Sequence, residues 1–455
     1  MNIVILGAGE VGKQLAWTLS TKRNSVAVVD SRADRLARLQ DHLDVMTVQG
    51  DCADFSVLKK AGIHKAELLV AASGSDPSNV LACQIARHLG VGKTICRLSS
   101  RCLFSAEDGF SADLLGIDHV ILPAEKCIRR ILRVLQHQCL VERVDFSVQD
   151  AQMSCVRVAP GSVVAGVRLA DFPDRELVSS IRFSAIVRNQ RLLIPRGDTV
   201  LAPGDEVYVA GPSANVEALF DLVDDESRRP SLVLVAGATR MARVLIPQLL
   251  ADGYQVRVIE ESRDESERFL DELGEGVMVI QGSATDARVL EEAGIGECGA
   301  FISVLRDDEK NILSCILAKE QGARKVVAVT NKAEYMDIVP ALKPIDCGFS
   351  PRLGAVNTVL NLLGSETGRV HAMLHRTHAY VYEFRVAPGS RLCGQRIADH
   401  TDGFPAALAL VLRGDQVLPA TGDAVLEEGD RVAAIATPEH EQHLAVLFRK
   451  PRLFG

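Results

Sequence analysis

Hydrophobic residues occur in short runs along this chain, and the segments between the runs have the mixed polar and apolar spacing of amphipathic helices. Apolar runs that alternate with helices predict a parallel, doubly wound α/β sheet. In the first part of the chain we expect strands at Asn2–Leu6, Val26–Val29, Val45–Val48, Leu68–Ala72, Thr94–Leu98 and Asp118–Leu122. We expect the helices between them at Lys13–Ser20, Ala33–His42, Ser56–Ala61, Pro77–Leu89 and Arg101–Leu115.

The first apolar run leads directly into a turn with three glycines. In a dinucleotide site one glycine forms the tight turn, one lets the backbone approach a pyrophosphate, and one lets the helix pack on the strand. The pyrophosphate then binds the free N–H groups at the start of the helix. We therefore expect a nucleotide site here, with a purely structural turn as the alternative. Its residues are Gly7, Ala8, Gly9, Glu10, Val11 and Gly12.

The second apolar run ends in Asp30, a position where a carboxylate can accept hydrogen bonds from both ribose hydroxyls. The same carboxylate repels a 2′-phosphate, so the sequence favours NAD over NADP. Because strand carboxyl ends line the crevice of such a sheet, we also expect Arg97 at the site, with an exposed surface charge as the alternative. Asp76 and Asn79 serve either as a helix cap or as ligand or interface residues.

From about Val141 the pattern changes to short strands separated by turn residues such as Pro203-Gly204-Asp205, which predicts a small α+β module. The opening then recurs about 230 residues later: Ser231–Ala236 is followed by Gly237, and Val386–Ser390 copies Val158–Ser162. Repeats at a nearly constant offset indicate a tandem duplication. We expect Rossmann-like domains at 1–140 and 230–370, each followed by a small α+β module, at 141–225 and 371–455.

The second glycine turn differs from the first, because Thr239 and Ala242 replace two of the three glycines. The Cβ of Thr239 lies where a pyrophosphate would approach most closely, whereas Glu260 keeps a ribose acceptor. The second turn is therefore either a nucleotide site or a structural copy. Its candidate residues are Gly237, Ala238, Thr239, Arg240, Met241 and Glu260.

Composition narrows the functional classes. A net charge of −8 argues against a sequence-independent nucleic-acid binder, and no apolar run approaches the length of a membrane span. We expect no secretory leader, because the chain begins directly with a strand-forming run. The 11 cysteines lack metal-ligand spacing, so we expect a reducing cytosol, mostly buried thiols and no metal site. His371, His375 and His378 are spaced to share a helix face but have no acidic or cysteine partner nearby.

Several motifs give the chain a resemblance to the TrkA family, tandem members of the RCK/KTN class that regulate Trk potassium uptake systems. The resemblance covers essentially the whole chain. The motifs are Ile5–Gly12, Val29-Asp30, Leu39-Gln40, Gly50-Asp51, Leu69–Ala71, Asp76 with Asn79, and Ser350–Leu353.

The resemblance implies a bound NAD or NADH, with ATP or ADP as alternatives. It implies that Gly7–Val11 hold the diphosphate and Asp30 the adenosine ribose. It places Asp51 and Cys52 beside the adenine, Ala72 and Ser73 along the site, and Arg97 at a phosphate or a neighbouring subunit. Relatives that favour ATP often have an arginine inside the glycine turn, and its absence from this turn favours NAD(H).

The expected function is that of a non-catalytic regulator that gates a membrane-embedded potassium channel subunit of the TrkH or TrkG kind. The resemblance implies a homotetrameric ring, without nucleic acid or membrane insertion, on the cytoplasmic face of the inner membrane. None of the five tyrosines is followed by lysine four residues later, as a short-chain oxidoreductase would require. The alternatives are an NAD(P)-dependent oxidoreductase and a regulatory subunit of another cation transporter.

Overall fold

The computed structural model describes the chain except for residues 21–23, 101–110, 147, 149, 190, 225–230, 333–334, 336–338, 340–341, 343, 364–367, 375–378, 401–405 and 451–455. The described residues divide into two compact units. One unit contains Met1–Cys127 together with Ser350–Leu362, and the other contains most of the remaining chain.

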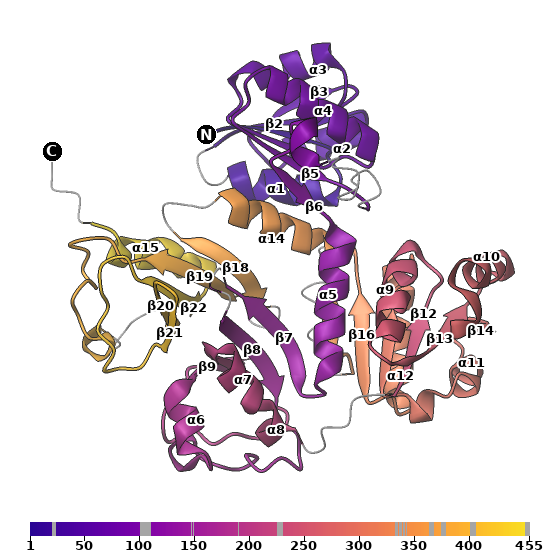
Figure 1. The fold of residues 1–455 in the computed structure, drawn as a ribbon. Coiled ribbons are helices and arrows are strands. Elements are labelled where there is room, and N and C mark those ends of the chain that lie inside the picture. The colour runs from indigo at the N-terminus through magenta and orange to yellow at the C-terminus, as the bar shows by residue number, and fades with distance from the viewer. Residues whose placement is uncertain are drawn as a thin grey trace. The chain divides into compact units, whose positions relative to one another are not determined.

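The first unit contains a six-stranded parallel sheet with the strand order β3-β2-β1-β4-β5-β6 (Figure 1). The strand order reverses between β1 and β4, so a ligand crevice is expected outside the carboxyl ends of these strands. Every residue of β4 is buried, as in a parallel sheet that helices cover on both faces. The strands are β1 (Asn2–Leu6), β2 (Ser25–Asp30), β3 (Met46–Gln49), β4 (Leu68–Ala71), β5 (Lys93–Arg97) and β6 (His119–Ile121).

Helices connect these strands, and the predicted α/β fold class is confirmed. The α-helices are α1 (Glu10–Ser20), α2 (Ala33–Gln40), α3 (Phe55–Lys60), α4 (Asp76–His88) and the start of α5 (Pro123–Gln136), and the 3₁₀ helices are η1 (Ile63–Lys65) and η2 (Ala112–Leu115). The predicted helix at 101–115 is therefore a 3₁₀ helix over its last residues, and 101–110 lie outside the described residues. Ser75 caps α4 by accepting the Ser78 N–H at 3.3 Å.

Helix α14 (Pro351–Leu363) comes from the second half of the chain but lies in the first unit up to Leu362. Lys93, at the start of β5, donates from Nζ to the Leu362 carbonyl at 2.6 Å. Lys126 on α5 donates to the Thr358 hydroxyl at 2.8 Å. A cation at the last carbonyls of a helix stabilises that end, so α14 is anchored in the unit that holds the first sheet.

The second unit repeats the parallel sheet, with the order β14-β13-β12-β15-β16-β17. The two parallel sheets have the same strand order relative to the chain, which confirms the predicted duplication. The strands are β12 (Leu232–Ala236), β13 (Gln255–Glu260), β14 (Met278–Gln281), β15 (Ala300–Ser303), β16 (Lys325–Val329) and β17 (Cys347–Phe349). The helices are α9 (Arg240–Ala251), α10 (Arg263–Leu273), η4 (Gly274–Gly276), α11 (Ala287–Glu292), η5 (Ile295–Glu297) and α12 (Asp308–Glu320).

The anchoring lysine is repeated as well. Lys325 begins β16 as Lys93 begins β5, and it is only 2% exposed. Its Nζ donates to four carbonyl oxygens, that of Val134 in the last turn of α5 and those of His137, Gln138 and Leu140, which follow the helix. Lys93 in the first sheet therefore anchors α14, the helix that follows β17 in the second half of the chain. Lys325 in the second sheet anchors α5, the helix that follows β6 in the first half.

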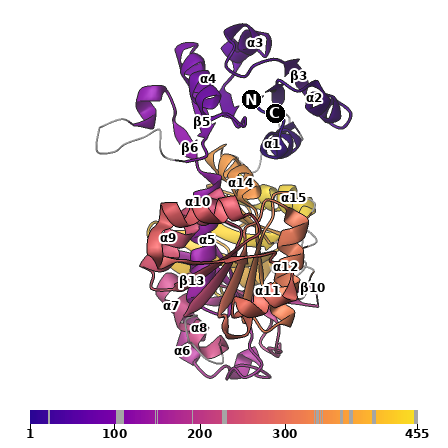
Figure 2. The same ribbon diagram turned by 90° about the vertical axis from the view of Figure 1, so that its right-hand side faces the viewer.

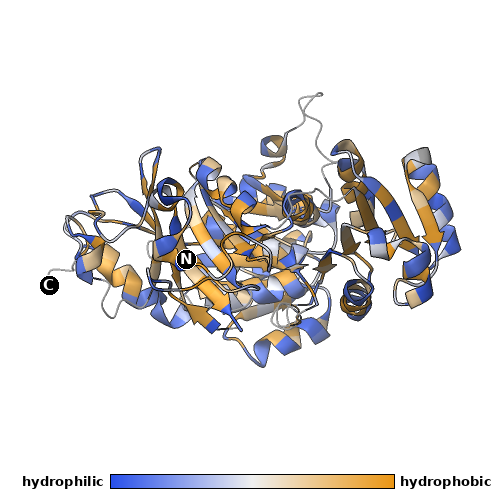
Figure 3. Cartoon of the chain, turned by 90° about the horizontal axis from the view of Figure 1, so that it is seen from below, coloured by the Kyte–Doolittle hydropathy of each residue, from blue (hydrophilic) through white to orange (hydrophobic). Residues whose placement is uncertain are grey.

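Two antiparallel sheets complete the second unit, with the orders β10-β9-β11-β8-β7 and β18-β19-β22-β20-β21. They share one hydrophobic core, to which Met153, Tyr208, Val381 and Ile435 contribute. Hydrophobic residues colour much of the strands, whereas the helices carry both colours (Figure 3).

The elements of these modules again match in the two halves. The strands are β7 (Leu140–Asp145), β8 (Ala151–Arg157), β9 (Arg182–Arg188), β10 (Arg191–Leu193), β11 (Glu206–Pro212), β18 (Arg369–Leu374), β19 (Ala379–Arg385), β20 (Ala407–Arg413), β21 (Gln416–Pro419) and β22 (Arg431–Ala436). The helices are η3 (Leu169–Asp171), α6 (Arg175–Ser180), α7 (Ser213–Ala218), α8 (Phe220–Val223), η7 (Ile397–His400), η8 (Pro438–His440) and α15 (Glu441–Phe448).

His371 lies on strand β18, with its Nε2 3.1 Å from the Glu383 carboxylate, so the helix face that the histidine spacing allows is not formed there. Alternation of His371 with Val370 and Ala372 is the strand pattern that favours this outcome. His375 and His378 lie outside the described residues. The described cysteines are free thiols, and all but Cys393 are buried, as predicted for most of them.

Candidate functional site

The first glycine turn has the geometry that its sequence predicts. Gly7 has a φ of +96°, and a Cβ there would lie 2.8 Å from the Ser73 Cα, so only glycine fits. A Cβ on Gly12 would lie 1.7 Å from the Gly7 carbonyl oxygen. No atom lies within 4 Å of the place where a Cβ on Gly9 would be. Gly7 and Gly12 therefore shape the turn, while Gly9 leaves open space above it.

Asp30 connects the end of β2 to the glycine turn. It is 5% exposed, and its carboxylate accepts the N–H groups of Ala8 at 2.6 Å and of Arg32 at 2.9 Å. The guanidinium of Arg35 lies 3.6 Å away. Since each carboxylate oxygen has two lone pairs, Asp30 retains the capacity to accept further hydrogen bonds from a ligand.

A cavity of about 360 Å³ lies over the carboxyl ends of the strands in the first unit. This volume falls within the range of small-molecule sites. Nine of the residues predicted for the first site line it: Gly7, Ala8, Gly9, Glu10, Val11, Asp30, Ala72, Ser73 and Arg97. The sheet topology brings these residues together because they all follow or end parallel strands.

The other three predicted residues lie outside this lining. Gly12 packs against the turn, as described above. Asp51 is exposed, and its carboxylate accepts the Ala53 N–H at 2.9 Å. Cys52 is buried, its thiol donates to the Val29 carbonyl at 3.7 Å, and burial raises its pKa to about 11. These contacts give all three residues local structural roles.

Asp76 and Asn79 hold the ends of β4 and β5 together. The fully buried Asn79 accepts both the N–H of Ser73 at 3.0 Å and its hydroxyl at 2.6 Å, and it donates to the Arg97 carbonyl at 2.9 Å. Asp76 accepts the N–H and the hydroxyl of Ser99, at 2.8 and 3.0 Å. Asn79 therefore positions Ser73 and Arg97 at the cavity, Asp76 connects the start of α4 to Ser99, and neither residue lines the cavity.

Four cationic side chains that sequence reasoning did not assign to the site also line the cavity. They are Lys13, Arg35, Arg38 and Arg352, and Leu39 and Gly74 complete the lining. Arg35 and Arg38 are three residues apart on the helix that follows Asp30, so their spacing on one helix face could have indicated them. Arg352 lies in a family motif, Ser350–Leu353, but nothing local in the sequence shows that its helix belongs to the first unit.

The lining is strongly basic, with five cationic side chains against the carboxylates of Glu10 and Asp30. Arg97 donates from Nη1 to the Ser73 carbonyl at 3.0 Å, and its buried Nε has no hydrogen-bond partner among the described residues. Burial lowers the pKa of Arg97, and the charge of Arg352 lowers it further, against the opposing effect of Asp76. The arrangement suits a ligand that carries several negative charges.

The second glycine turn is closed by its own side chains. Ala238 donates to the Glu260 carboxylate at 2.7 Å, as Ala8 does to Asp30. The Thr239 hydroxyl, however, donates to the Val304 carbonyl at 2.9 Å and caps α9 through the Ala242 N–H. The remaining candidates lie around it: Gly237 is buried with a φ of +102°, Arg240 is exposed and Met241 is half-buried.

The second copy also loses two of the cations of the first. At the repeat offset, Glu265 replaces Arg35 and Val329 replaces Arg97. Arg243, which corresponds to Lys13, donates to the Ala238 carbonyl at 2.8 Å and pairs with Glu265 and Glu272. The cation that corresponds to Lys13 is therefore neutralised within the protein.

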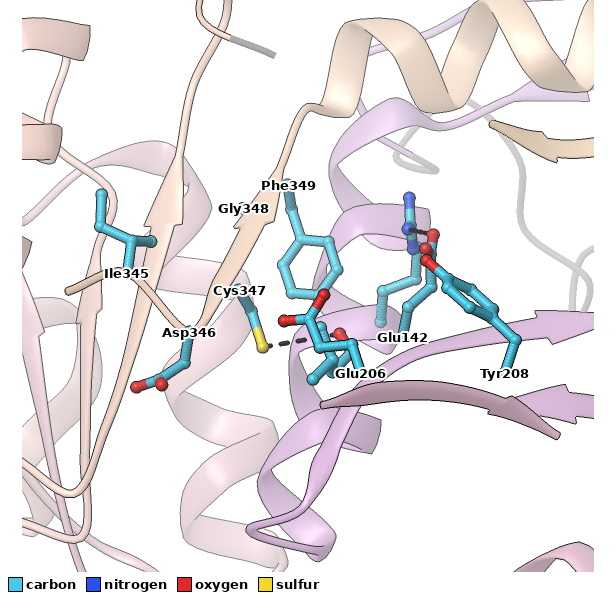
Figure 4. Close-up of a pocket in the computed structure, with 10 residues that line it drawn as sticks. Glu142, Glu206, Tyr208, Ile345, Asp346, Cys347, Gly348 and Phe349 are labelled. Carbon is cyan, nitrogen blue, oxygen red and sulfur yellow. Dashed lines mark hydrogen bonds and ion pairs between the residues drawn. The ribbon is translucent and has the colours of Figure 1, made fainter. Parts of the chain in front are cut away.

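A second cavity, in the second unit, is far smaller, at about 30 Å³ (Figure 4). Glu142 from β7, Tyr208 from β11 and Phe349 from β17 line it. Arg130 pairs with Glu142 at 2.7 Å, and burial raises the pKa of Glu142. The space suits a single water molecule and excludes a nucleotide.

Family models match both parts of the repeat. The TrkA-N domain matches residues 3–123 and 233–346, and the TrkA-C domain matches 153–224 and 381–449. The fold and the glycine-turn crevice thus define a tandem protein with two Rossmann-like sheets, each followed by a small antiparallel module. The chain belongs to the TrkA family. It is 33% identical to the Trk system potassium uptake protein TrkA of Halomonas elongata over 95% of each chain.

Solved structures share the fold. The GsuK RCK domain is 21% identical, with a TM-score of 0.63 over 98% of this chain and 95% of that one. The GsuK channel bound to NAD is also 21% identical, with a TM-score of 0.61 over 98% of this chain and 78% of that one. Among the described residues, no helix has the length and apolar character needed to span a bilayer.

Proposed function

We propose that this chain is the nucleotide-binding regulatory subunit of a potassium uptake system. The observation that carries the proposal is the basic crevice over the first glycine turn, in a chain of the TrkA family. The Halomonas relative, named as a potassium uptake protein, supports the transport role. The GsuK channel bound to NAD supports a dinucleotide ligand on this fold.

The ligand is NAD or NADH, and ATP or ADP are the alternatives. Its diphosphate binds the N–H groups of the turn Gly7–Val11, and Asp30 accepts hydrogen bonds from the adenosine ribose. Asp51 and Cys52 lie on the adenine side, beyond the lining. Ala72, Ser73 and Arg97 border the other end of the ligand.

The second turn is a structural copy in this proposal. Thr239 places a side chain where Gly9 leaves open space, and Arg243 is occupied by backbone and carboxylate partners. One ligand therefore binds per chain. The proposal also divides the chain into four domains, at 1–140, 141–225, 230–370 and 371–455. Helices α5 and α14 are exceptions, because each is anchored by a lysine from the other half of the chain.

The protein acts without catalysis, as a homotetrameric ring on the cytoplasmic face of the inner membrane. Its partner is a membrane-embedded potassium channel subunit of the TrkH or TrkG kind. A partner from another cation transporter is the second candidate, and purification with detergent-solubilised membranes distinguishes the two by identifying the captured subunit. Steady NADH oxidation with a carbonyl substrate, lost in Asp30→Asn, would instead establish the oxidoreductase alternative.

Isothermal titration with NADH, NAD⁺, ATP and ADP tests the site. We expect wild type to bind with a stoichiometry of one per chain, and Asp30→Asn to weaken binding about tenfold or more, since a hydrogen bond to a charged group contributes roughly 1.5–3 kcal/mol. Glu260→Gln, the same change in the second turn, is the matched control and should bind like wild type. A stoichiometry of two, or equal losses in both variants, contradicts the assignment to the first turn.

A further inference from the structure

A basic cavity of about 490 Å³ lies in the second small module, outside both glycine turns. Its volume falls within the range of small-molecule sites. It lies at the ends of β18, β19, β20 and β22, which meet at one edge of the antiparallel sheet. Three arginines, Arg369, Arg385 and Arg431, line it together with the carboxylate of Glu383.

The arginines lie on the face of the sheet that α15 leaves uncovered. Side chains alternate across a strand, so Glu383 and Arg385 share one face of β19 and Phe384 lies on the other. Helix α15, labelled in Figures 1 and 2, covers that other face, where Phe448 stacks on Phe384 with ring centroids 5.0 Å apart. Arg369 and Arg385 are exposed, so a small molecule can reach them.

The sheet register places two of these arginines directly opposite each other. Arg385 ends β19 and pairs across the strands with Arg431, the first residue of β22. Opposite residues of neighbouring antiparallel strands project from the same face with Cβ atoms about 5 Å apart, so like charges there repel each other. Arg385 forms no ion pair with the described residues, and Arg431 lies 3.8 Å from Glu383. An anion between the two arginines would remove this repulsion.

Among the described residues that line the cavity, Glu383 supplies the only carboxylate, and it is already engaged. It is 5% exposed, and its Oε2 lies 3.1 Å from His371 Nε2. Burial raises the pKa of Glu383, but the hydrogen bond with His371 and the charges of Arg431 and Arg369 lower it more, so Glu383 is ionised. One carboxylate against three guanidinium groups leaves an excess of positive charge in the cavity.

The first module shows how the same register position is satisfied when it carries a carboxylate. There Arg157 on β8 lies opposite Glu206 on β11, as Arg385 lies opposite Arg431. The guanidinium of Arg157 bonds to Glu206 at 2.9 Å and also to the carboxylate of Asp346. The second module keeps the arginine but has a second arginine in place of the glutamate, so its described residues supply no equivalent carboxylate.

We propose that this cavity binds a small oxyanion, a carboxylate or a phosphate, between Arg385 and Arg431, with Arg369 at its edge. Guanidinium groups bind both kinds of oxyanion through paired N–H donors. The site is separate from the crevice over the first glycine turn and does not depend on the proposed nucleotide function. Because the anion neutralises two opposite arginines, its binding stabilises the module.

Isothermal titration of the full-length protein with citrate and with pyrophosphate tests the site. We expect wild type to bind at least one of them, and Arg385→Gln to weaken that binding about tenfold or more, because a hydrogen-bonded charge is removed. A preference for citrate identifies a carboxylate ligand, and a preference for pyrophosphate identifies a phosphate. Because Arg385 has no ion pair to lose, the thermal unfolding midpoint of this variant without anion should equal or exceed that of wild type.

Arg391→Gln is the matched control, because Arg391 is an exposed arginine of the same module that does not line the cavity. It should bind both anions like wild type. Pyrophosphate also suits the first crevice, so Arg35→Gln, a change in the lining of that crevice, separates the two sites.

Three results would overturn the site: no binding of either anion by wild type, equal losses in Arg385→Gln and Arg391→Gln, or a loss confined to Arg35→Gln. We expect Arg385→Gln to bind NADH like wild type. Failure of the anion titration therefore leaves the proposed nucleotide function in place, and failure of the NADH titration leaves this site in place.

Discussion

At the scale of single residues, substitutions at Gly9 and Gly12 should affect different properties, ligand binding at Gly9 and stability at Gly12. A Cβ on Gly9 meets no atom within 4 Å, and Gly9 is not among the glycines with positive φ, so Gly9→Ala should fold normally. The added methyl group lies where the diphosphate approaches, and overpacking of about 1–3 kcal/mol corresponds to a loss of affinity of roughly 5- to 150-fold. Titration with the tightest ligand measures this loss.

Gly12→Ala gives the opposite result. Its Cβ would lie 1.7 Å from the Gly7 carbonyl oxygen, so the turn must distort and we expect unfolding to become easier by roughly 1–3 kcal/mol. Urea unfolding of both variants tests the pair. A Gly12→Ala protein as stable as wild type would show that the first turn can relax as the second one does around Ala242.

The Cys52 thiol gives a prediction about pH. Burial raises its pKa from 9.0 to about 11, and the charges of Asp30 and Asp51 act in the same direction. The folded state therefore favours the protonated thiol, so its contribution to stability is present below pH 9.0 and is lost as the pH rises through about 11. At pH 8 we expect iodoacetamide to label Cys393 in the folded protein but Cys52 only after unfolding, as peptide mass mapping would show.

At the scale of elements, the two anchoring lysines are unequal. Lys325 is buried and donates to four carbonyl oxygens in and just after the last turn of α5, so Lys325→Met leaves several buried acceptors without a donor. We expect a loss of roughly 3–5 kcal/mol in the free energy of unfolding. Lys93→Met removes the bond to the Leu362 carbonyl and should cost about 1 kcal/mol. Similar midpoints for both variants in urea would contradict this ranking.

The anchored helices also mark the limit of what the sequence could predict. Strands, the glycine turn and Asp30 follow from local patterns, because apolar runs and glycine spacing act within a few residues. The same patterns indicate the duplication. Nothing in the residues around α14 shows which parallel sheet it joins, because an amphipathic face specifies burial and not a partner. Arg352 therefore could not be placed at the crevice, although its motif was recognisable.

At the scale of the whole molecule, the two halves of the duplication share a fold but differ at the glycine turn. Both halves keep the sheet order, the acidic residue at the end of the second strand and the anchoring lysine. Among the described residues, the first turn stays open and five cationic side chains line its crevice, one of them Arg352 from the second half. A ligand in the first crevice would contact residues from both halves of the chain, and contacts that differ between two states let one binding event shift the whole protein.

In the proposed ring, gating requires that the ligand bind two states with different affinities, since equal affinities shift no equilibrium. By linkage, the membrane partner must then change nucleotide affinity by the same factor by which the nucleotide changes partner affinity. We expect the Kd for NADH, measured with and without the detergent-solubilised partner, to differ by roughly 5- to 150-fold, the usual range of such coupling. Arg352→Gln should reduce this factor, while Arg38→Gln should preserve it. Identical Kd values with and without the partner would show that NADH binding does not gate the channel.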